Sequence, residues 1–422
     1  MCPFVFEEIK ASLSLTAKAV ISMTTVVERI HARINYQVYS RLGLNKLAKK
    51  KEQTQGVSRF VYNSIRALSK HSEVALGMVL RSLIEQSPEA MGALINPNTK
   101  SVLNGICGDY LHQTKNALAI SMQLRKDGQE MTQQAWISLL KKSQGKILLL
   151  VHGLCMNDQQ WHVEGYDHGE YLAETIGCEV VYLQYNSGLH ISENGQILAS
   201  LLEKFFCWQQ EHFDTNRLGI SSLQLSILAH SMGGLVTRSA CYYAQQQSLN
   251  WIKHVEKFIC LGTPHHGSVW ERVGHKVHQL LNTNSYSRPL GVLANMRSAG
   301  ITDLRYGNLI EQDWNLEENH QDEFFVECDK RQPIPLPQGV NCYQLAAVKG
   351  NYPRSKINKW MTDEFLGDGL VSLKSALGQH KNKQYQLEYP EGNFKIISNC
   401  THMDLLSNPN VSAVLASWLA DQ

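Results

Sequence analysis

The sequence lacks the features of several protein classes. No uninterrupted apolar run approaches the roughly 18 residues that cross a bilayer. Its 10 cysteines stand singly, with no C-x-x-C pair, so the sequence predicts free thiols, many of them buried, rather than a disulfide framework. Met1–Lys10 contains Glu7 and Glu8 and no sustained apolar core, which argues against a signal peptide. We therefore expect a cytoplasmic protein.

Motifs for nucleotides and catalytic metals are also missing. There is no G-x-G-x-x-G sequence and no phosphate-binding loop, so neither nucleotide chemistry nor a nucleic-acid partner is expected. Histidines are frequent at 152–168 and again at His265, His266, His275 and His278, which raises the alternative of a metal site. However, no H-E-x-x-H sequence or Cys/His tetrad with zinc-like spacing accompanies them, and we expect no catalytic metal.

The chain divides into two parts that differ in the spacing of their apolar residues and in their charge. Its 422 residues, 43% hydrophobic and 18% charged, are those of a folded protein. Residues 1–142 show apolar residues at helical spacing, as in Val27, Ile30 and Ile34, and have a net charge of +9, whereas the remaining residues have −7, which together give the +2 of the chain. We expect an N-terminal helical extension whose basic face is either solvated, packed on the rest of the chain, or in peripheral contact with a membrane of anionic lipids.

Residues 143–422 predict an α/β domain. Apolar runs alternate with helical stretches such as Ile197–Phe213, which indicates a mainly parallel sheet with ligands at the carboxyl ends of its strands. The expected strands are Ile147–Val151, Glu179–Leu183, Leu223–Leu228, Phe258–Leu261, Asn341–Val348 and Phe394–Ile397. Residues 270–337 interrupt this alternation with a long polar stretch, which predicts a cap or lid insertion.

The stretch that ends the third strand has the layout of a nucleophile elbow. Ala-His-Ser-Met-Gly-Gly at 229–234 leads into a helix-like run from Leu235. In such an elbow a strained strand-to-helix turn holds the serine, here Ser231, clear of the sheet. The positions two before and two after the serine must be small because strand and helix nearly touch, and Ala229 and Gly233 satisfy this. His230 is a supporting residue.

A serine nucleophile needs a base and an acid, in the chain order nucleophile, acid, histidine. Asp368 is the preferred acid because Gly367 and Gly369 allow a tight turn around it, and Asp363 is its rival. His402 follows the last strand and is the preferred base. The rival base, His380, lies in a polar run that predicts an exposed loop.

The oxyanion of an acyl-transfer reaction needs two amide donors. The backbone N–H of Met232, directly after the nucleophile, is the first expected donor. The loop after Ile147–Val151 should supply the second, from Leu154. His152 and Gly153 are expected to support this loop rather than to react.

These motifs carry a family resemblance. Val-His-Gly-Leu at 151–154, Ala-His-Ser-Met-Gly-Gly at 229–234, Leu-Gly-Thr-Pro-His-His-Gly-Ser at 261–268 and Gly-Asp-Gly-Leu-Val at 367–371 resemble bacterial triacylglycerol lipases and GPI inositol-deacylase-like hydrolases of the α/β-hydrolase superfamily. The resemblance begins near Ile147 and implies an acyl-serine mechanism with Ser231, Asp368 and His402. Some of those lipases hold a structural calcium through an aspartate two residues beyond the histidine, and only Asp404 matches that set.

The expected function is therefore a serine esterase of α/β-hydrolase fold that cleaves lipid or other acyl esters in lipid metabolism. Acyl transfer and thioester hydrolysis on the same fold are alternatives. A further alternative is a non-catalytic protein that docks on a membrane or a partner through the basic N-terminal helices.

Overall fold

The computed structural model describes residues 97–212, 223–268, 298–315, 329, 331–350 and 367–420. All of these except 97–100 and 110–119 belong to one compact unit, which contains the sheet and every described candidate site residue. The predicted N-terminal helices, their basic surface, most of the cap insertion and Asp363 lie outside the described residues.

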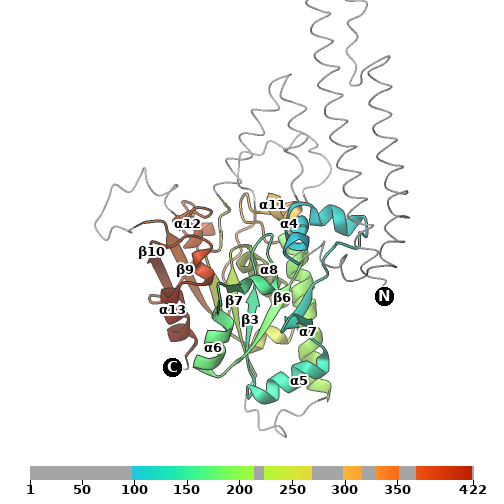
Figure 1. Ribbon diagram of the computed structural model, residues 1–422. Helices are drawn as coiled ribbons and strands as arrows, with labels where there is room; N and C mark the ends of the chain where they lie inside the picture. The colour runs from blue at the N-terminus through green and yellow to red at the C-terminus, as the bar shows by residue number, and fades with distance from the viewer. Residues whose placement is uncertain are drawn as a thin grey trace, which may run out of the picture. The chain divides into compact units, whose positions relative to one another are not determined.

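Within the described residues, the main sheet has eight strands in the order β10-β9-β8-β7-β3-β6-β1-β2 (Figure 1). The six strands from β10 to β6 in this order are parallel, whereas β1 and β2 are antiparallel additions at one edge. A separate small hairpin pairs β4 with β5. The strands are β1 (Gln123–Lys126), β2 (Gln129–Glu130), β3 (Lys146–Val151), β4 (His162–Val163), β5 (Tyr166–Asp167), β6 (Glu179–Gln184), β7 (Gln224–His230), β8 (Val255–Leu261), β9 (Asn341–Val348) and β10 (Phe394–Ser398).

Helices cover both faces of this sheet. The α-helices are α4 (Pro97–Gln113), α5 (Gln133–Lys142), α6 (His168–Ile176), α7 (Ile191–His212), α8 (Met232–Gln246), α11 (Ala299–Asp303), α12 (Leu373–Ala376) and α13 (Pro409–Leu419). Short 3-10 turns occur at η1 (Asp158–Trp161), η3 (Trp251–His254), η4 (Glu311–Asp313), η6 (Lys383–Tyr385) and η7 (Asp404–Leu406).

Strand β3 shows why the sheet is sandwiched between two helical layers. The side chains of Ile147, Leu149 and Val151 join the apolar core under α5, α7 and α8. The alternate residues Leu148 and Leu150 join a second core under α6 and α13. All five are buried, as expected for a strand covered on both faces. Figure 1 shows α6 and α13 on one side of the strands and α7 and α8 on the other.

Helix α6 illustrates how local sequence sets the elements. The Asp167 carboxylate accepts the amides of Gly169 and Glu170, which would otherwise lack partners at the helix start. The helix stops at Gly177, whose φ of +67° lies in the left-handed region that favours glycine. Thr132 caps α5 and Asn408 caps α13 in the same way.

The observed elements agree closely with most of the predicted strands, but the sheet begins earlier than the sequence indicates. β1, β2 and α5 all precede residue 143, where the α/β domain was expected to start. β1 pairs with β6, from Gln123 opposite Gln184 to Arg125 opposite Tyr182, so this part of the expected helical extension is an integral edge of the sheet. Helix α7 also begins at Ile191, earlier than the predicted Ile197.

Two predictions from composition can be examined in the described region. The eight cysteines there are all unpaired, and Cys178, Cys241, Cys260, Cys342 and Cys400 are buried. No helix in this region is both long enough and apolar enough to span a membrane.

Candidate active site

The carboxyl end of β7 forms a strained turn at Ser231. This serine has φ +53° and ψ −124°, which is rare for a residue with a side chain, and α8 starts at the next residue. Its amide donates to the carbonyl of Leu261 at the end of β8, at 2.8 Å. A methyl group on Gly233 would lie 2.5 Å from the Val151 carbonyl oxygen and 2.6 Å from that of His152. Strand and helix therefore approach so closely that only glycine fits at 233, as the elbow requires.

Asp368 and His402 form a buried acid–base pair. The distance from His402 Nδ1 to Asp368 Oδ2 is 2.6 Å, and their side chains are only 5% and 1% exposed. The other carboxylate oxygen of Asp368 accepts the amides of Leu370 and Val371 at 2.9 and 2.8 Å. The His402 amide donates to the Asp368 carbonyl at 3.1 Å, which joins the two loops directly. The carboxylate thus fixes the orientation of the imidazole.

The rival base His380 lies elsewhere. Its ring contacts the backbone of Asn382 and stands 4.9 Å from the ring of His266, whereas the Asp368 carboxylate is paired with His402.

His230 and Gly262 bring the serine and the acid–base pair to one edge of the sheet. The ring of His230, next to Ser231, lies 4.7 Å from the His402 ring, and its Nε2 is 3.2 Å from the His402 carbonyl oxygen. Gly262 follows Leu261 and would, with a methyl group, sit 3.2 Å from both Asp368 Oδ2 and His402 Cε1. In the described region no hydrogen bond joins Ser231 Oγ to the His402 ring, as is common before substrate binds.

The expected oxyanion donors flank the serine. Met232 is the first residue of α8, and Leu154 lies on the loop after β3. Neither amide has an acceptor among the described residues, so both are free to donate to a substrate oxygen. The loop comes close to Ser231, because a methyl group on Gly153 would lie 3.1 Å from Ser231 Cβ.

The contacts of His152 fit its expected role of supporting the loop after β3. Its ring stacks on Tyr185 with a centroid distance of 4.3 Å, and the Tyr185 hydroxyl donates to the His152 carbonyl at 2.8 Å. Complete burial lowers the pKa of His152 to about 4, so the imidazole is neutral at pH 7. A neutral ring in this position holds the loop and places no positive charge beside the serine.

His168 is a site-adjacent residue that the sequence did not single out. Its Nε2 is 2.9 Å from the Leu405 carbonyl oxygen, and its Nδ1 is 3.2 Å from Ser412 Oγ. It therefore ties the loop after His402 to α6 and α13. Burial lowers the pKa of His168. No spacing or motif marks this residue, because its partners are more than 200 positions away.

The Thr263–Ser268 loop is held by two arginines. Arg238 Nη1 lies 3.2 Å from His265 Nδ1, and Arg331 Nη2 lies 2.7 Å from His266 Nδ1. Burial lowers the pKa of both histidines, and the nearby guanidinium charges lower it further. Imidazoles that face guanidinium groups are poorly suited to bind a metal cation.

Asp404, the calcium candidate, has a local role. Its carboxylate accepts the Thr401 amide at 2.8 Å, and its own amide donates to Thr401 Oγ1 at 3.3 Å. In the part of the chain that the structure describes, no three His, Cys, Asp or Glu side chains are grouped as metal ligands would be.

Comparisons with known proteins found a family model and several solved structures that are similar to this chain. The family model of the PGAP1-like alpha/beta domain matches residues 142–327. The mature lipase BlEst2 of Bacillus licheniformis is 18% identical with a TM-score of 0.39, over 66% of this chain and 93% of that one. A lipase-esterase related protein from Clostridium acetobutylicum is 12% identical with a TM-score of 0.33, over 66% and 94%.

Staphylococcus hyicus lipase is 13% identical with a TM-score of 0.32, over 65% of this chain and 93% of that one. No curated protein matches the chain significantly. The mainly parallel sheet, the helices on both its faces and the family match together show that this chain has the α/β-hydrolase fold and resembles PGAP1-like hydrolases.

Proposed function

We propose that this chain is a serine hydrolase that cleaves carboxylic esters through an acyl-serine intermediate. The observation that carries the proposal is the 2.6 Å Asp368–His402 pair, which contacts His230, the neighbour of a serine with φ +53° at the end of β7. A carboxylate-oriented imidazole next to a serine on a strained turn is the arrangement that activates a hydroxyl for attack on a carbonyl.

In the proposed reaction Ser231 Oγ attacks the ester carbonyl while His402 Nε2 takes its proton. The amides of Met232 and Leu154 donate to the oxyanion of the tetrahedral intermediate, and each such donor contributes roughly 3 kcal/mol of transition-state stabilisation. His402 then gives the proton to the leaving alcohol. A water molecule, deprotonated by His402, attacks the acyl-serine; the acyl–Oγ bond then breaks, and His402 returns the proton to Ser231 Oγ as the acid leaves.

The test is active-site labelling with a fluorophosphonate probe together with hydrolysis of 4-nitrophenyl esters. The wild-type protein should be labelled at Ser231, and Ser231→Ala should lose both labelling and turnover. A Ser231→Ala protein that hydrolyses esters as fast as wild type would refute the proposal. An unlabelled Ser231 with salt-sensitive binding to anionic liposomes would favour a non-catalytic docking protein instead.

Acyl chains are the favoured substrates because apolar side chains flank the acid and the base. Leu370 is 48% exposed and lies two residues after Asp368, and Met403 is 50% exposed and follows His402. Burying one such side chain against an acyl chain contributes about 1.5–3 kcal/mol. Lipid and other acyl esters are the candidate substrates, and hydrolysis, acyl transfer and thioester cleavage are the candidate reactions. Product analysis with added alcohols separates acyl transfer from hydrolysis, and assays of matched thioesters test thioester cleavage.

The substrate proposal is tested with a chain-length series of acyl esters on Leu370→Ser and Met403→Ser. Because each of these side chains is already about half buried, only about half of its burial free energy is available. We therefore expect kcat/KM to fall about five- to tenfold for long chains and to stay nearly constant for acetate. Phe394→Ser is the matched control, because Phe394 is 48% exposed but begins β10, at the opposite end of that strand from His402. Equal losses for short and long chains would contradict the contact with acyl chains.

A further inference from the structure

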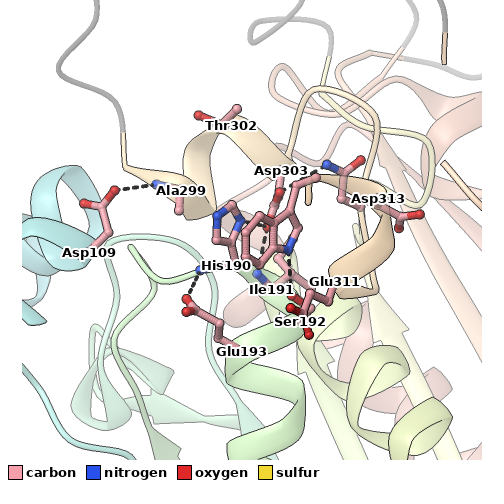
Figure 2. A network of polar contacts seen from close by, with 12 residues as sticks. Asp109, His190, Ile191, Ser192, Glu193, Ala299, Thr302, Asp303, Glu311 and Asp313 are labelled. Carbon is pink, nitrogen blue, oxygen red and sulfur yellow. Dashed lines mark hydrogen bonds and ion pairs between the residues drawn. The ribbon is translucent and has the colours of Figure 1, made fainter. Parts of the chain in front are cut away.

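A second histidine–carboxylate pair lies outside the candidate triad (Figure 2). His190 Nδ1 is 3.0 Å from Asp303 Oδ2, with side-chain exposures of 20% and 0%. The same carboxylate oxygen accepts the amide of Ile191 at 2.8 Å, and Oδ1 accepts from Asn308 Nδ2 at 3.1 Å. Asp303 thus satisfies an amide at the start of α7 that has no partner within its own helix.

Trp314 encloses the other side of His190. The two rings are parallel within 2°, with centroids 3.7 Å apart, and Trp314 Nε1 donates to Ser192 Oγ at 2.9 Å. A charged imidazole stacked on an indole face is favourable, since the ring face is electron-rich. The pair and the stack together join α11 and η4 to the start of α7.

The helix held by this pair, α11, contacts Met232 and the 187–189 segment, which in turn holds the residue after Leu154. The Gly300 amide donates to the Gly188 carbonyl at 3.1 Å, and a methyl group on Gly300 would lie 3.0 Å from Met232 Cε. On the other side, the Ser187 hydroxyl accepts the amide of Cys155, the residue after Leu154, at 3.0 Å. α11 therefore packs on the side chain of one expected donor and on the segment that orients the other.

Three carboxylates of the described residues favour the charged form of His190. Asp303 on α11 contacts it directly, Glu193 on α7 accepts the His190 amide at 3.0 Å, and Asp109 on α4 accepts the Ala299 amide at 3.0 Å. Figure 2 shows these carboxylates together with Glu311 and Asp313 on η4. Burial alone lowers the pKa of His190, but Asp303, Glu193 and Asp109 outweigh it and raise this pKa above the ordinary value.

We propose that His190 and Asp303 are positioning residues whose charged pair holds α11 against the oxyanion hole, so that loss of the His190 charge lowers kcat. The proposal rests on the function proposed above. A buried carboxylate without its cation is unfavourable, so Asp303 and α11 should loosen when His190 is neutral. Because the pair raises the pKa of His190, its stabilising contribution is complete below about pH 6.5 and disappears as the pH rises through the folded-state pKa.

The experiment measures kcat and KM of the full chain for 4-nitrophenyl butyrate from pH 5 to 9. For wild type we expect kcat to fall roughly tenfold on the alkaline side, less than the roughly hundredfold loss of an entire donor. His190→Gln should show the lowered kcat at every pH, with KM within about twofold. His190→Arg, which stays charged and can stack on Trp314, should keep the high kcat without the alkaline fall.

The matched control is His162→Gln, an exposed histidine on β4, which should behave as wild type. Wild-type kcat and pH profile in His190→Gln, or an alkaline fall retained in His190→Arg, would overturn the proposal.

Hydrogen exchange of the α11 amides separates this proposal from the proposed function. Corrected for the intrinsic effect of pH, protection at 299–303 should decrease in His190→Gln and, for wild type, at high pH. Unchanged protection would overturn the positioning role whatever the activity. Absence of both labelling and ester hydrolysis in wild type would overturn the proposed function alone.

Discussion

Gly262 offers a sharp test of the acid–base pair. It follows β8 with φ +58°, and its amide donates to the Leu345 carbonyl at 2.9 Å. A methyl group there would lie 2.8 Å from Leu405 Cδ1 and 3.2 Å from both Asp368 Oδ2 and His402 Cε1. The added carbon must therefore push the carboxylate and the imidazole by some tenths of an ångström.

Gly262→Ala should have two separable effects. Alanine in the left-handed region costs about 1 kcal/mol of the free energy of unfolding. The displacement of His402 should lower kcat by about tenfold, because a misplacement of about 1 Å costs about a hundredfold and this shift is smaller. KM should change little, since the added methyl group meets Leu405, Asp368 and His402 and not Leu370 or Met403, the residues proposed to contact the acyl chain.

Gly177→Ala is the matched control. Gly177 has φ +67° at the end of α6, and nothing lies within 4 Å of an added methyl group. It should lose the same stability of about 1 kcal/mol and keep wild-type kcat. Stability is measured by urea unfolding, and kcat with a soluble short-chain ester. If Gly262→Ala keeps full kcat while losing as much stability as Gly177→Ala, the Asp368–His402 pair is not the working pair.

Two further variants test neighbouring parts of the site. Asp368→Asn should keep the fold, because its amide oxygen can still accept from Leu370 and Val371, but should lower kcat by about 10⁴-fold through loss of the imidazole's orientation; a loss below tenfold in steady-state assays would contradict the assigned role. Asp404→Ala should lower the free energy of unfolding by about 0.5–1 kcal/mol through loss of the Thr401 contact. Because that contact lowers the pKa of Asp404, the contribution is present above about pH 4 and lost as the pH falls through the folded-state pKa. A melting temperature that rises with calcium in wild type and not in the variant would instead assign an ion to Asp404.

The predictable part of the fold is what depends on local pattern and burial. β3 is found from sequence because its five apolar residues are all buried, and β9 matches its predicted bounds at Asn341 and Val348. β1 was missed because its sequence, Gln-Leu-Arg-Lys, has a single buried apolar residue, Leu124. This segment forms a strand because it pairs with β6. An edge strand of this kind is specified by the strand it pairs with, and its own composition gives little indication of a strand.

In the candidate site too, the residues set by local sequence pattern could be predicted, and those set by distant partners could not. The serine turn and the acid are marked by small residues at fixed offsets, since backbone crowding at Gly233 leaves no choice of side chain. The supports are not marked, because His168 and Asp303 act on segments far away in sequence. Helix α7 starts at Ile191 rather than Ile197 for this reason, as a carboxylate 112 positions later caps it.

The antiparallel strand at the sheet edge decides where the chain can be cut. A fragment starting at residue 143 would lose β1 and expose the backbone amides and carbonyls of β6 that Gln123, Leu124 and Arg125 now cover. An uncovered, largely apolar strand invites pairing with a second chain. Truncations meant to isolate the α/β domain should therefore begin before Gln123, and those that do not are expected to aggregate.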